Sequence, residues 1–323
     1  MKTVCIYHSI DLDGWMSAAI VKHWWNLVEK SPNDKLSFIG YNYGEPIPDL
    51  SEYDKVIMCD ISFDNPYIMY NIAIEKELTW LDHHISAIDL IENYDWDNVD
   101  SILGIRDTNF AASELTWKYF FPNEEMPEIV RLLGMYDSFR HRGTDEEQRV
   151  LEFQYGARQV ISKYEEAYIY LVRCTKATEL LRKNIQNSSP EELKHCYPIE
   201  KAIHEIGVSI YKYLCTEAKQ VYKNGFEAWF NNGDNTSAGC TYKFICVNKE
   251  RFNPISFGID YHKEGYDGAA CFHYGNGVWN FGLYNDNGLV DCSQIAKQYG
   301  GGGHRGSSGM RLNNTQFLQF ING

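Results

Sequence analysis

Eight acidic or imidazole side chains stand at the ends of short apolar segments in the first half of this sequence. They are His8, Asp11, Asp13, Asp60, Asp82, His83, His84 and Asp137. An oxygen-rich set with a few imidazoles suits Mn²⁺ or Mg²⁺ better than Zn²⁺, which prefers thiolates and imidazoles. Five carboxylates and three imidazoles are too many for one ion. The set therefore predicts two ions, roughly 3.5 to 4 Å apart, that share a carboxylate and promote in-line displacement at phosphorus.

Each member of this set also has a purely structural interpretation. An Asp-x-Asp-Gly stretch such as DLDG (11–14) can form a turn and a helix cap. Asp60 could end a strand in a turn, and Asp137 could end a helix. The pair His83 and His84 resists this interpretation, because adjacent strand residues point to opposite faces and reach one crevice together only at a strand end.

Strand-like runs alternate with helical segments over the first hundred residues. The predicted strands cover 3–7, 37–43, 55–60 and 78–83, and the predicted helices cover 15–29 and 65–76. This alternation predicts an α/β fold, a parallel sheet with helices on both faces. Because ligands bind at the carboxyl ends of the strands of such a sheet, the eight side chains should converge at one edge.

The rest of the chain has a different pattern. It is nearly all helical from 111 to about 187, where the polar NSSPEE (187–192) interrupts it, and a further helix is predicted over 199–222. Four strand-like segments follow: FEAWFNN, CTYKFICVN, PISFGIDYH and GAACFHYGNGVWNFGLYN. The last contains Asn276-Gly277, a strong hairpin signal. The pattern predicts a second, smaller α+β domain.

The composition narrows the class of protein. The net charge of −14 argues against a broad basic surface that grips long nucleic acid. No apolar run reaches the 18 residues of a membrane span, and the apolar run at the N-terminus is too short for a signal peptide, so a cytoplasmic location is expected. The nine cysteines include no Cys-x-x-Cys pair, so neither a structural zinc site nor a disulfide framework is indicated.

Four segments, taken in order, resemble the four motifs of the DHH phosphoesterases: HSIDLDG (8–14), VIMCD (56–60), LDHH (81–84) and MYD (135–137). GGGHRGSSG (301–309) is similar to the signature of the DHHA1 domain. The two residues between His8 and Asp11 resemble the oligoribonuclease-like (nanoRNase) subgroup more than the inorganic pyrophosphatases, which have three.

The resemblance implies a domain organisation. A Rossmann-like DHH catalytic domain with a helical extension would cover 1–190, and a connecting helix would cover 191–222. A DHHA1 substrate-binding domain would cover 223–323. The active site would lie in the cleft between the two domains.

The resemblance also implies a role for each residue of the set. His8 and Asp11 would hold one metal ion, and Asp60 would bridge it to the second. The ligands of the second ion would be Asp13, His83 and Asp137. Two catalytic residues would complete the site: His84 beside the scissile phosphate, and Asp82 orienting its neighbours.

The glycine-rich segment admits two interpretations. By itself it is typical of a flexible loop. Glycines also let backbone N–H groups approach a phosphate, and Arg305 could bind one with two hydrogen bonds. With the resemblance, the second interpretation predicts a substrate-binding set of Gly301, Gly302, Gly303, His304, Arg305 and Ser307.

The leading functional hypothesis is a phosphodiesterase that cleaves short RNA or DNA oligonucleotides or dinucleotides to mononucleotides, by two-metal activation of a bridging water. The expected cofactors are two divalent ions, Mn²⁺ first, with Mg²⁺ or Co²⁺ as alternatives. A phosphatase acting on 3′-phosphoadenosine 5′-phosphate, a bisphosphorylated nucleoside, and a nucleotide-binding module without turnover are the competing hypotheses. A homodimer is left open, and no membrane partner is expected.

Overall fold

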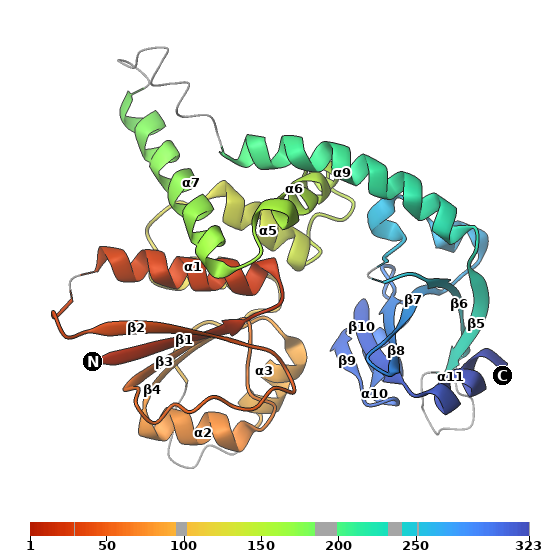
Figure 1. Cartoon of the computed structure of the whole chain (residues 1–323), viewed down its shortest axis with the longest axis horizontal. Coiled ribbons are helices and arrows are strands. Elements are labelled where there is room, and N and C mark those ends of the chain that lie inside the picture. Colours follow the sequence, from red (N-terminus) through yellow and green to blue (C-terminus); the bar gives the residue numbers. More distant parts are fainter. Residues whose placement is uncertain (29, 95–101, 185–198, 232–240, 251, 323) are drawn as a thin grey trace. The chain divides into compact units, whose positions relative to one another are not determined.

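The computed structural model of the chain describes residues 1–28, 30–94, 102–184, 199–231, 241–250 and 252–322. It separates into two units, Met1–Ile210 and Tyr211–Gly323, each with a sheet of its own (Figure 1). The polar segment NSSPEE at 187–192 lies outside the described residues. The domain boundaries implied by the resemblance therefore stay predictions.

The first unit is built on a four-stranded sheet in which every neighbouring pair is parallel, in the order β2-β1-β3-β4. Its strands are β1 (Lys2–His8), β2 (Lys35–Tyr41), β3 (Lys55–Cys59) and β4 (Glu77–Leu81). These bounds lie within two residues of the predicted ones. The α/β fold class predicted from the sequence is confirmed.

Both faces of this sheet are covered by helices (Figure 1). One face packs on α1 (Leu12–Leu27) and α4 (Ala112–Phe120), and the other on α2 (Pro66–Glu75) and α3 (Ile85–Glu92). Strand β1 shows why: Cys5 faces the α1 side and Val4 the α2 side, because successive strand residues point to opposite faces. A strand buried on both faces reads as a continuous apolar run, as KTVCIYH does.

A short segment that the strand pattern missed extends the edge of this sheet beside β4. The Trp80 amide donates to the Leu103 carbonyl (2.8 Å) and the Asp82 amide to Ile105 (3.2 Å). Gly104 has a φ of 119°, and a Cβ there would lie 2.0 Å from the Trp80 carbonyl oxygen, so this position requires glycine.

The predicted helical extension packs on the other side of α1. It consists of α5 (Glu128–Asp137), α6 (Glu147–Val160), α7 (Tyr164–Asn184) and the first half of α9 (Ile199–Tyr222). Helices α6 and α9 touch backbone to backbone, since a Cβ on Gly156 would lie 2.0 Å from the Ile203 carbonyl oxygen. Among the described residues, no helix combines the length and the apolar character that a membrane crossing needs.

The second unit holds a six-stranded sheet in the order β5-β6-β7-β8-β10-β9. The strands are β5 (Phe226–Asn231), β6 (Thr241–Asn248), β7 (Gly268–Gly275), β8 (Val278–Tyr284), β9 (Gly302–His304) and β10 (Ser307–Leu312). Helices α10 (Cys292–Lys297) and α11 (Asn314–Asn322) pack on this sheet, and the second half of α9 also belongs to this unit. The predicted hairpin is confirmed, with Asn276 and Gly277 both at positive φ between β7 and β8.

One strand prediction in this unit is wrong. PISFGIDYH (254–262) forms two 3₁₀ turns, Ile255–Phe257 and Tyr261–Glu264, instead of a strand. Gly258 and Gly265 end these turns at positive φ, a conformation that a strand does not contain. The apolar pattern of the segment arises because the side chains of Phe257 and Tyr261 are buried although both residues lie in turns.

Candidate metal centre

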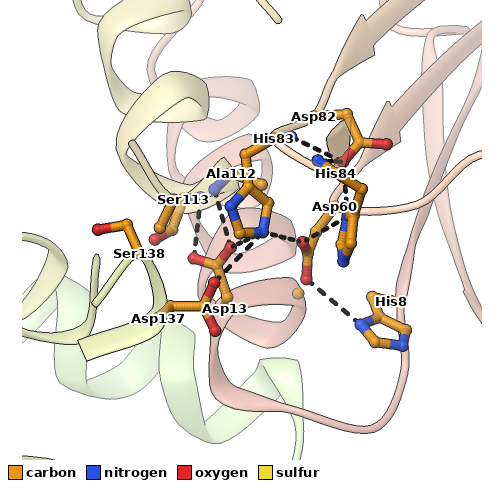
Figure 2. A network of polar contacts seen from close by, with 12 residues as sticks. His8, Asp13, Asp60, Asp82, His83, His84, Ala112, Ser113, Asp137 and Ser138 are labelled. Atoms are coloured by element: carbon orange, nitrogen blue, oxygen red, sulfur yellow. Dashed lines mark hydrogen bonds and ion pairs between the residues drawn. The ribbon is translucent and has the colours of Figure 1, made fainter. Parts of the chain in front are cut away.

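The eight predicted side chains lie together at the carboxyl edge of the parallel sheet, and Figure 2 labels all of them except Asp11. They come from the last residue of β1 (His8), the start of α1 (Asp11, Asp13), the residue after β3 (Asp60), the residues after β4 (Asp82, His83, His84) and the last residue of α5 (Asp137). The sequence argument predicted this convergence, and the structure shows it.

The Asp60 carboxylate lies between two imidazoles. Its Oδ2 is 3.4 Å from His8 Nδ1, and its Oδ1 is 3.4 Å from His83 Nε2. Three groups of described residues share Asp60, each with candidate ligand atoms within 4.8 Å of one another; one joins it to Asp82 and His84, and the other two reach the two imidazoles on either side of it. These two are His8, Asp11 and Asp60, and Asp13, Asp60 and His83.

Asp137 adds a further carboxylate on the His83 side, where its Oδ2 lies 3.2 Å from His83 Nε2 (Figure 2). The side chain of Asp137 is 31% exposed, whereas that of Asp60 is 2% exposed. Asp137 is thus the more solvent-accessible of these two candidate ligands.

Asp11 combines the structural and the functional interpretation of its segment. Its Oδ1 accepts a hydrogen bond from the Gly14 amide (3.0 Å) and so caps α1, while its Oδ2 lies 2.8 Å from His8 Nδ1. Gly14 belongs to the helix rather than to a turn. A Cβ there would lie 2.1 Å from the His8 carbonyl oxygen, so glycine lets α1 start directly against the end of β1.

Asp13 is buried and is anchored by the start of another helix. It accepts hydrogen bonds from the amides of Ala112 (2.8 Å) and Ser113 (3.0 Å) at the N-terminus of α4 (Figure 2). These amides orient the carboxylate, with Oδ2 3.9 Å from His83 Nε2. The α4 amides are part of the site that the sequence did not reveal, because they lie about a hundred residues away and carry no side-chain signal.

Asp82 holds the two histidines that follow it. Its Oδ1 accepts from the amides of His83 (2.7 Å) and His84 (3.1 Å) and lies 2.8 Å from His84 Nδ1. Its Oδ2 accepts from Trp80 Nε1 (3.1 Å). A fully buried carboxylate with this many donors fixes the rings of its neighbours.

Burial and mutual charge shift the pKa values of the carboxylates in opposite directions. Burial raises the pKa of Asp13, and the charges of Asp60 and Asp137 raise it further. Burial likewise raises the pKa of Asp137 to about 6, with His83 opposing and Asp60 adding to the shift. Burial would also raise the pKa of Asp60, but its contacts with His8 and His83 outweigh burial and lower it.

The imidazoles respond to these acids. Burial lowers the pKa of His8, but the carboxylates of Asp11 and Asp60 outweigh it and raise the pKa to about 11. The pKa of His83 is also raised, since Asp60 and Asp137 outweigh its burial. The excess negative charge of the site thus stabilises the protonated forms of these imidazoles.

The donor set fits divalent cations. His8 Nδ1 and Asp60 Oδ1 are buried, yet neither forms a well-aligned hydrogen bond with any described group, although the Asp11 carboxylate is 2.8 Å from His8 Nδ1. Buried polar atoms left in this way are costly unless something else binds them. Carboxylate oxygens with few imidazoles are the ligands that Mn²⁺ and Mg²⁺ accept.

The glycine-rich segment of the second unit forms the β9–β10 hairpin rather than a loose loop. The hairpin itself accounts for two glycines, since a Cβ on Gly301 would lie 2.1 Å from the Gly309 carbonyl oxygen, and Gly303 has a φ of 137°. Gly302 has open space around its Cα. Arg305 donates to the Gly288 carbonyl (3.0 Å) and Ser308 to His304 (2.7 Å). Substrate binding by Gly301, Gly302, Gly303, His304, Arg305 and Ser307 stays a prediction.

Tyr43 is a further neighbour of the site that sequence reasoning missed. Its ring lies 6.1 Å from that of His8 and 6.3 Å from that of His84, and the residue is 37% exposed. A tyrosine two residues beyond a strand end carries no signal of such a role, because only the fold brings β2 beside β1.

Comparisons with known proteins give remote similarities. No protein-family model matches the chain. An uncharacterized protein of Acanthamoeba polyphaga mimivirus is 24% identical over 324 residues, which cover 95% of this chain and 66% of that protein. The chain therefore spans just under two thirds of the length of this relative.

Three solved structures align with nearly the whole chain. The pGpG-specific phosphodiesterase PggH from Vibrio cholerae is 12% identical with a TM-score of 0.39, over 100% of this chain and 97% of that one. An exopolyphosphatase-related protein from Bacteroides fragilis is 12% identical with a TM-score of 0.43, over 99% and 91%. RecJ in complex with Mg²⁺ from Thermus thermophilus is 13% identical with a TM-score of 0.39, over 99% and 48%. At these levels of similarity, the activity of this chain has to follow from its own site.

Proposed function

We propose that the chain is a metal-dependent phosphoesterase of the DHH/DHHA1 family that cleaves short oligonucleotides or dinucleotides to mononucleotides. One observation carries the proposal: Asp60 offers one oxygen to the group of His8 and Asp11 and the other to the group of Asp13 and His83. A carboxylate shared in this way is the arrangement expected of a bridging ligand between two ions.

The proposed ligand sets follow from the same contacts. His8 and Asp11 hold one ion, Asp60 bridges, and the second ion takes Asp13, His83 and Asp137. Two divalent ions there would supply Lewis acidity toward phosphoryl oxygens and a nucleophile near neutral pH, with Mn²⁺ the first choice.

His84 is the proton-bearing group of the proposed reaction. Asp82 lies 2.8 Å from Nδ1 of His84, which favours the tautomer with hydrogen on Nδ1 and orients the ring. Burial lowers the pKa of His84, yet Asp82 and Asp60 outweigh burial and raise it. The charged imidazole can then stabilise negative charge on a phosphoryl oxygen or donate a proton to the leaving oxygen.

The choice of short substrates rests on charge. A chain with a net charge of −14 repels a long polyanion, whereas a substrate of a few nucleotides needs only local positive charge. The proposed role of the second unit is to bind the far end of the substrate through the glycine-rich hairpin, which would limit its length.

The test is a panel assay on the purified full chain with Mn²⁺. Its substrates are RNAs of two to five nucleotides, a linear and a cyclic dinucleotide and 3′-phosphoadenosine 5′-phosphate. We expect release of mononucleotides from the short RNAs or the linear dinucleotide. In Asp60→Asn the activity should fall by more than about 100-fold, which exceeds the usual effect of removing a group that only orients a metal ligand. The control is Asp64→Asn, an exposed aspartate four residues on.

Two results would contradict the proposal. Release of inorganic phosphate from 3′-phosphoadenosine 5′-phosphate alone would make the chain a phosphomonoesterase. Binding of the oligonucleotides with no turnover under Mn²⁺, Mg²⁺ or Co²⁺ would make it a nucleotide-binding module.

A further inference from the structure

Arg158, near the C-terminal end of α6, packs against two aromatic rings. Its guanidinium carbon lies 5.4 Å from the ring centre of Tyr136 and 5.2 Å from that of Tyr155. Its Nη2 is 3.5 Å from the Tyr136 hydroxyl. Tyr136 directly precedes Asp137 at the end of α5, so these contacts place the guanidinium against the residue that precedes a proposed ligand.

Arg158 differs from three of the other arginines of α5, α6 and their connection in how its charge is balanced, whereas Arg142 likewise has no ion pair among the described residues and packs on the Phe139 ring. Arg131, Arg140 and Arg149 each form an ion pair with a glutamate. Arg158 forms none with a carboxylate in the part of the chain that the structure describes, and the residue is exposed. Aromatic rings contact the face of a guanidinium and leave the N–H groups at its edge for an anion.

The pKa of Arg158 is affected by its neighbours, which include a carboxylate of the site. Burial of part of the side chain lowers the pKa of Arg158, while Tyr136, Tyr155 and the carboxylate of Asp11 raise it, and the net direction is upward. Asp11 is a proposed ligand of the first ion. The guanidinium thus packs against the residue that precedes Asp137, and the charge of Asp11 acts on it.

We propose that Arg158 binds a nonbridging phosphoryl oxygen of the substrate at this centre, an inference that rests on the proposed function. The five carboxylates of the centre would repel a phosphate ester, and the ions and the charged imidazole of His84 supply the attraction near them. A planar cation that is positioned by rings rather than neutralised by an acid adds charge-assisted hydrogen bonds toward the ester. Neither the motifs nor their spacing indicated this residue.

The test compares Arg158→Gln and Arg158→Lys with the matched control Arg149→Gln on the same helix. Arg149 pairs with Glu128 and Glu146, outside the centre. With bis(4-nitrophenyl) phosphate and Mn²⁺, we expect kcat/KM to fall about 10- to 100-fold in Arg158→Gln, as for loss of a hydrogen bond to a charged group. A smaller fall is expected in Arg158→Lys, which keeps the charge without the fork, and Arg149→Gln should change by less than about twofold.

Two binding measurements separate substrate contact from a structural role. Calorimetric titration with Mn²⁺ should give wild-type affinity in Arg158→Gln, because arginine is not a ligand. Titration with adenosine 5′-monophosphate in the presence of Mn²⁺ should show about tenfold weaker binding or more. A loss of Mn²⁺ affinity equal to the loss of activity would show that Arg158 only supports the fold, and unchanged binding of the nucleotide would also overturn the inference.

The nucleotide titration also separates failure of this inference from failure of the proposed function. If the wild type cleaves no phosphate ester but binds adenosine 5′-monophosphate more tightly than Arg158→Gln does, the phosphoesterase proposal fails and the anion site stands. If the wild type binds no nucleotide with Mn²⁺, the inference about Arg158 fails as well.

Discussion

Asp60 has a backbone conformation that few residues other than glycine adopt, with a φ of 62°. Left-handed residues at a strand end are strained, although aspartate tolerates this region better than most side chains. Here the strained residue is also the one whose carboxylate lies between the two imidazoles. The fold thus accepts local strain where the shared ligand has to turn back toward β1.

Asp82 provides a test of how the two histidines are oriented rather than of metal ligation. Asp82→Asn replaces an oxygen that accepts from three donors of His83 and His84 by a neutral amide. We expect activity with Mn²⁺ to fall about 10- to 100-fold, the usual effect of losing a group that orients a ligand. Steady-state kinetics measure it, with Asp64→Asn as the control. Wild-type activity in Asp82→Asn would show that the histidines need no such anchor.

The elements matter because they bring the side chains of the centre within reach of one another. β1, β3 and β4 end side by side since the strands are parallel, and α1 and α5 approach that edge from one face. Helix α1 starts directly against the end of β1, through Gly14.

Gly14→Ala tests this approach. Alanine favours a helix over glycine by about 1 kcal/mol, so without a clash the change would stabilise the protein. Because the new Cβ would lie 2.1 Å from the His8 carbonyl oxygen, we expect a lower unfolding midpoint and weaker Mn²⁺ binding instead. Thermal unfolding and calorimetry measure the two effects. The control is Leu27→Ala, an exposed position on the same helix, and a raised midpoint in Gly14→Ala would contradict the prediction.

Without metal, repulsion among the buried carboxylates of the centre should lower the stability of the whole first unit. The pKa of Asp137 is raised from 3.8 to about 6 by burial first, with a smaller contribution from Asp60. A carboxyl group whose pKa is raised by folding binds its proton more tightly in the folded state. The metal-free protein should therefore lose stability as pH rises between about 4 and 6.

Added Mn²⁺ should reverse this loss, and the gain should be larger at about pH 7.5 than at about pH 5, because the ligands must be deprotonated to bind. At 100 times the dissociation constant the gain is about 2.7 kcal/mol. Thermal unfolding in EDTA and in Mn²⁺ at the two pH values measures it. In Asp137→Asn the pH dependence without metal should shrink, whereas in Asp64→Asn it should not. An equal midpoint with EDTA and with Mn²⁺ would show that the centre binds no such ion.

The sequence by itself determined the parallel sheet of the first unit, the helical extension, the hairpin at Asn276 and the set of eight side chains. Local patterns suffice for these, because a strand buried on both faces has to be apolar and the carboxyl ends of parallel strands share an edge. Only the tertiary structure decided which oxygen of Asp60 faces which histidine, that the amides of α4 hold Asp13, and that Arg158 lies beside Tyr136. It also replaced a predicted strand by two 3₁₀ turns around Phe257 and Tyr261. These features depend on contacts between residues far apart in the chain, and burial from a turn leaves the same apolar pattern as burial from a strand.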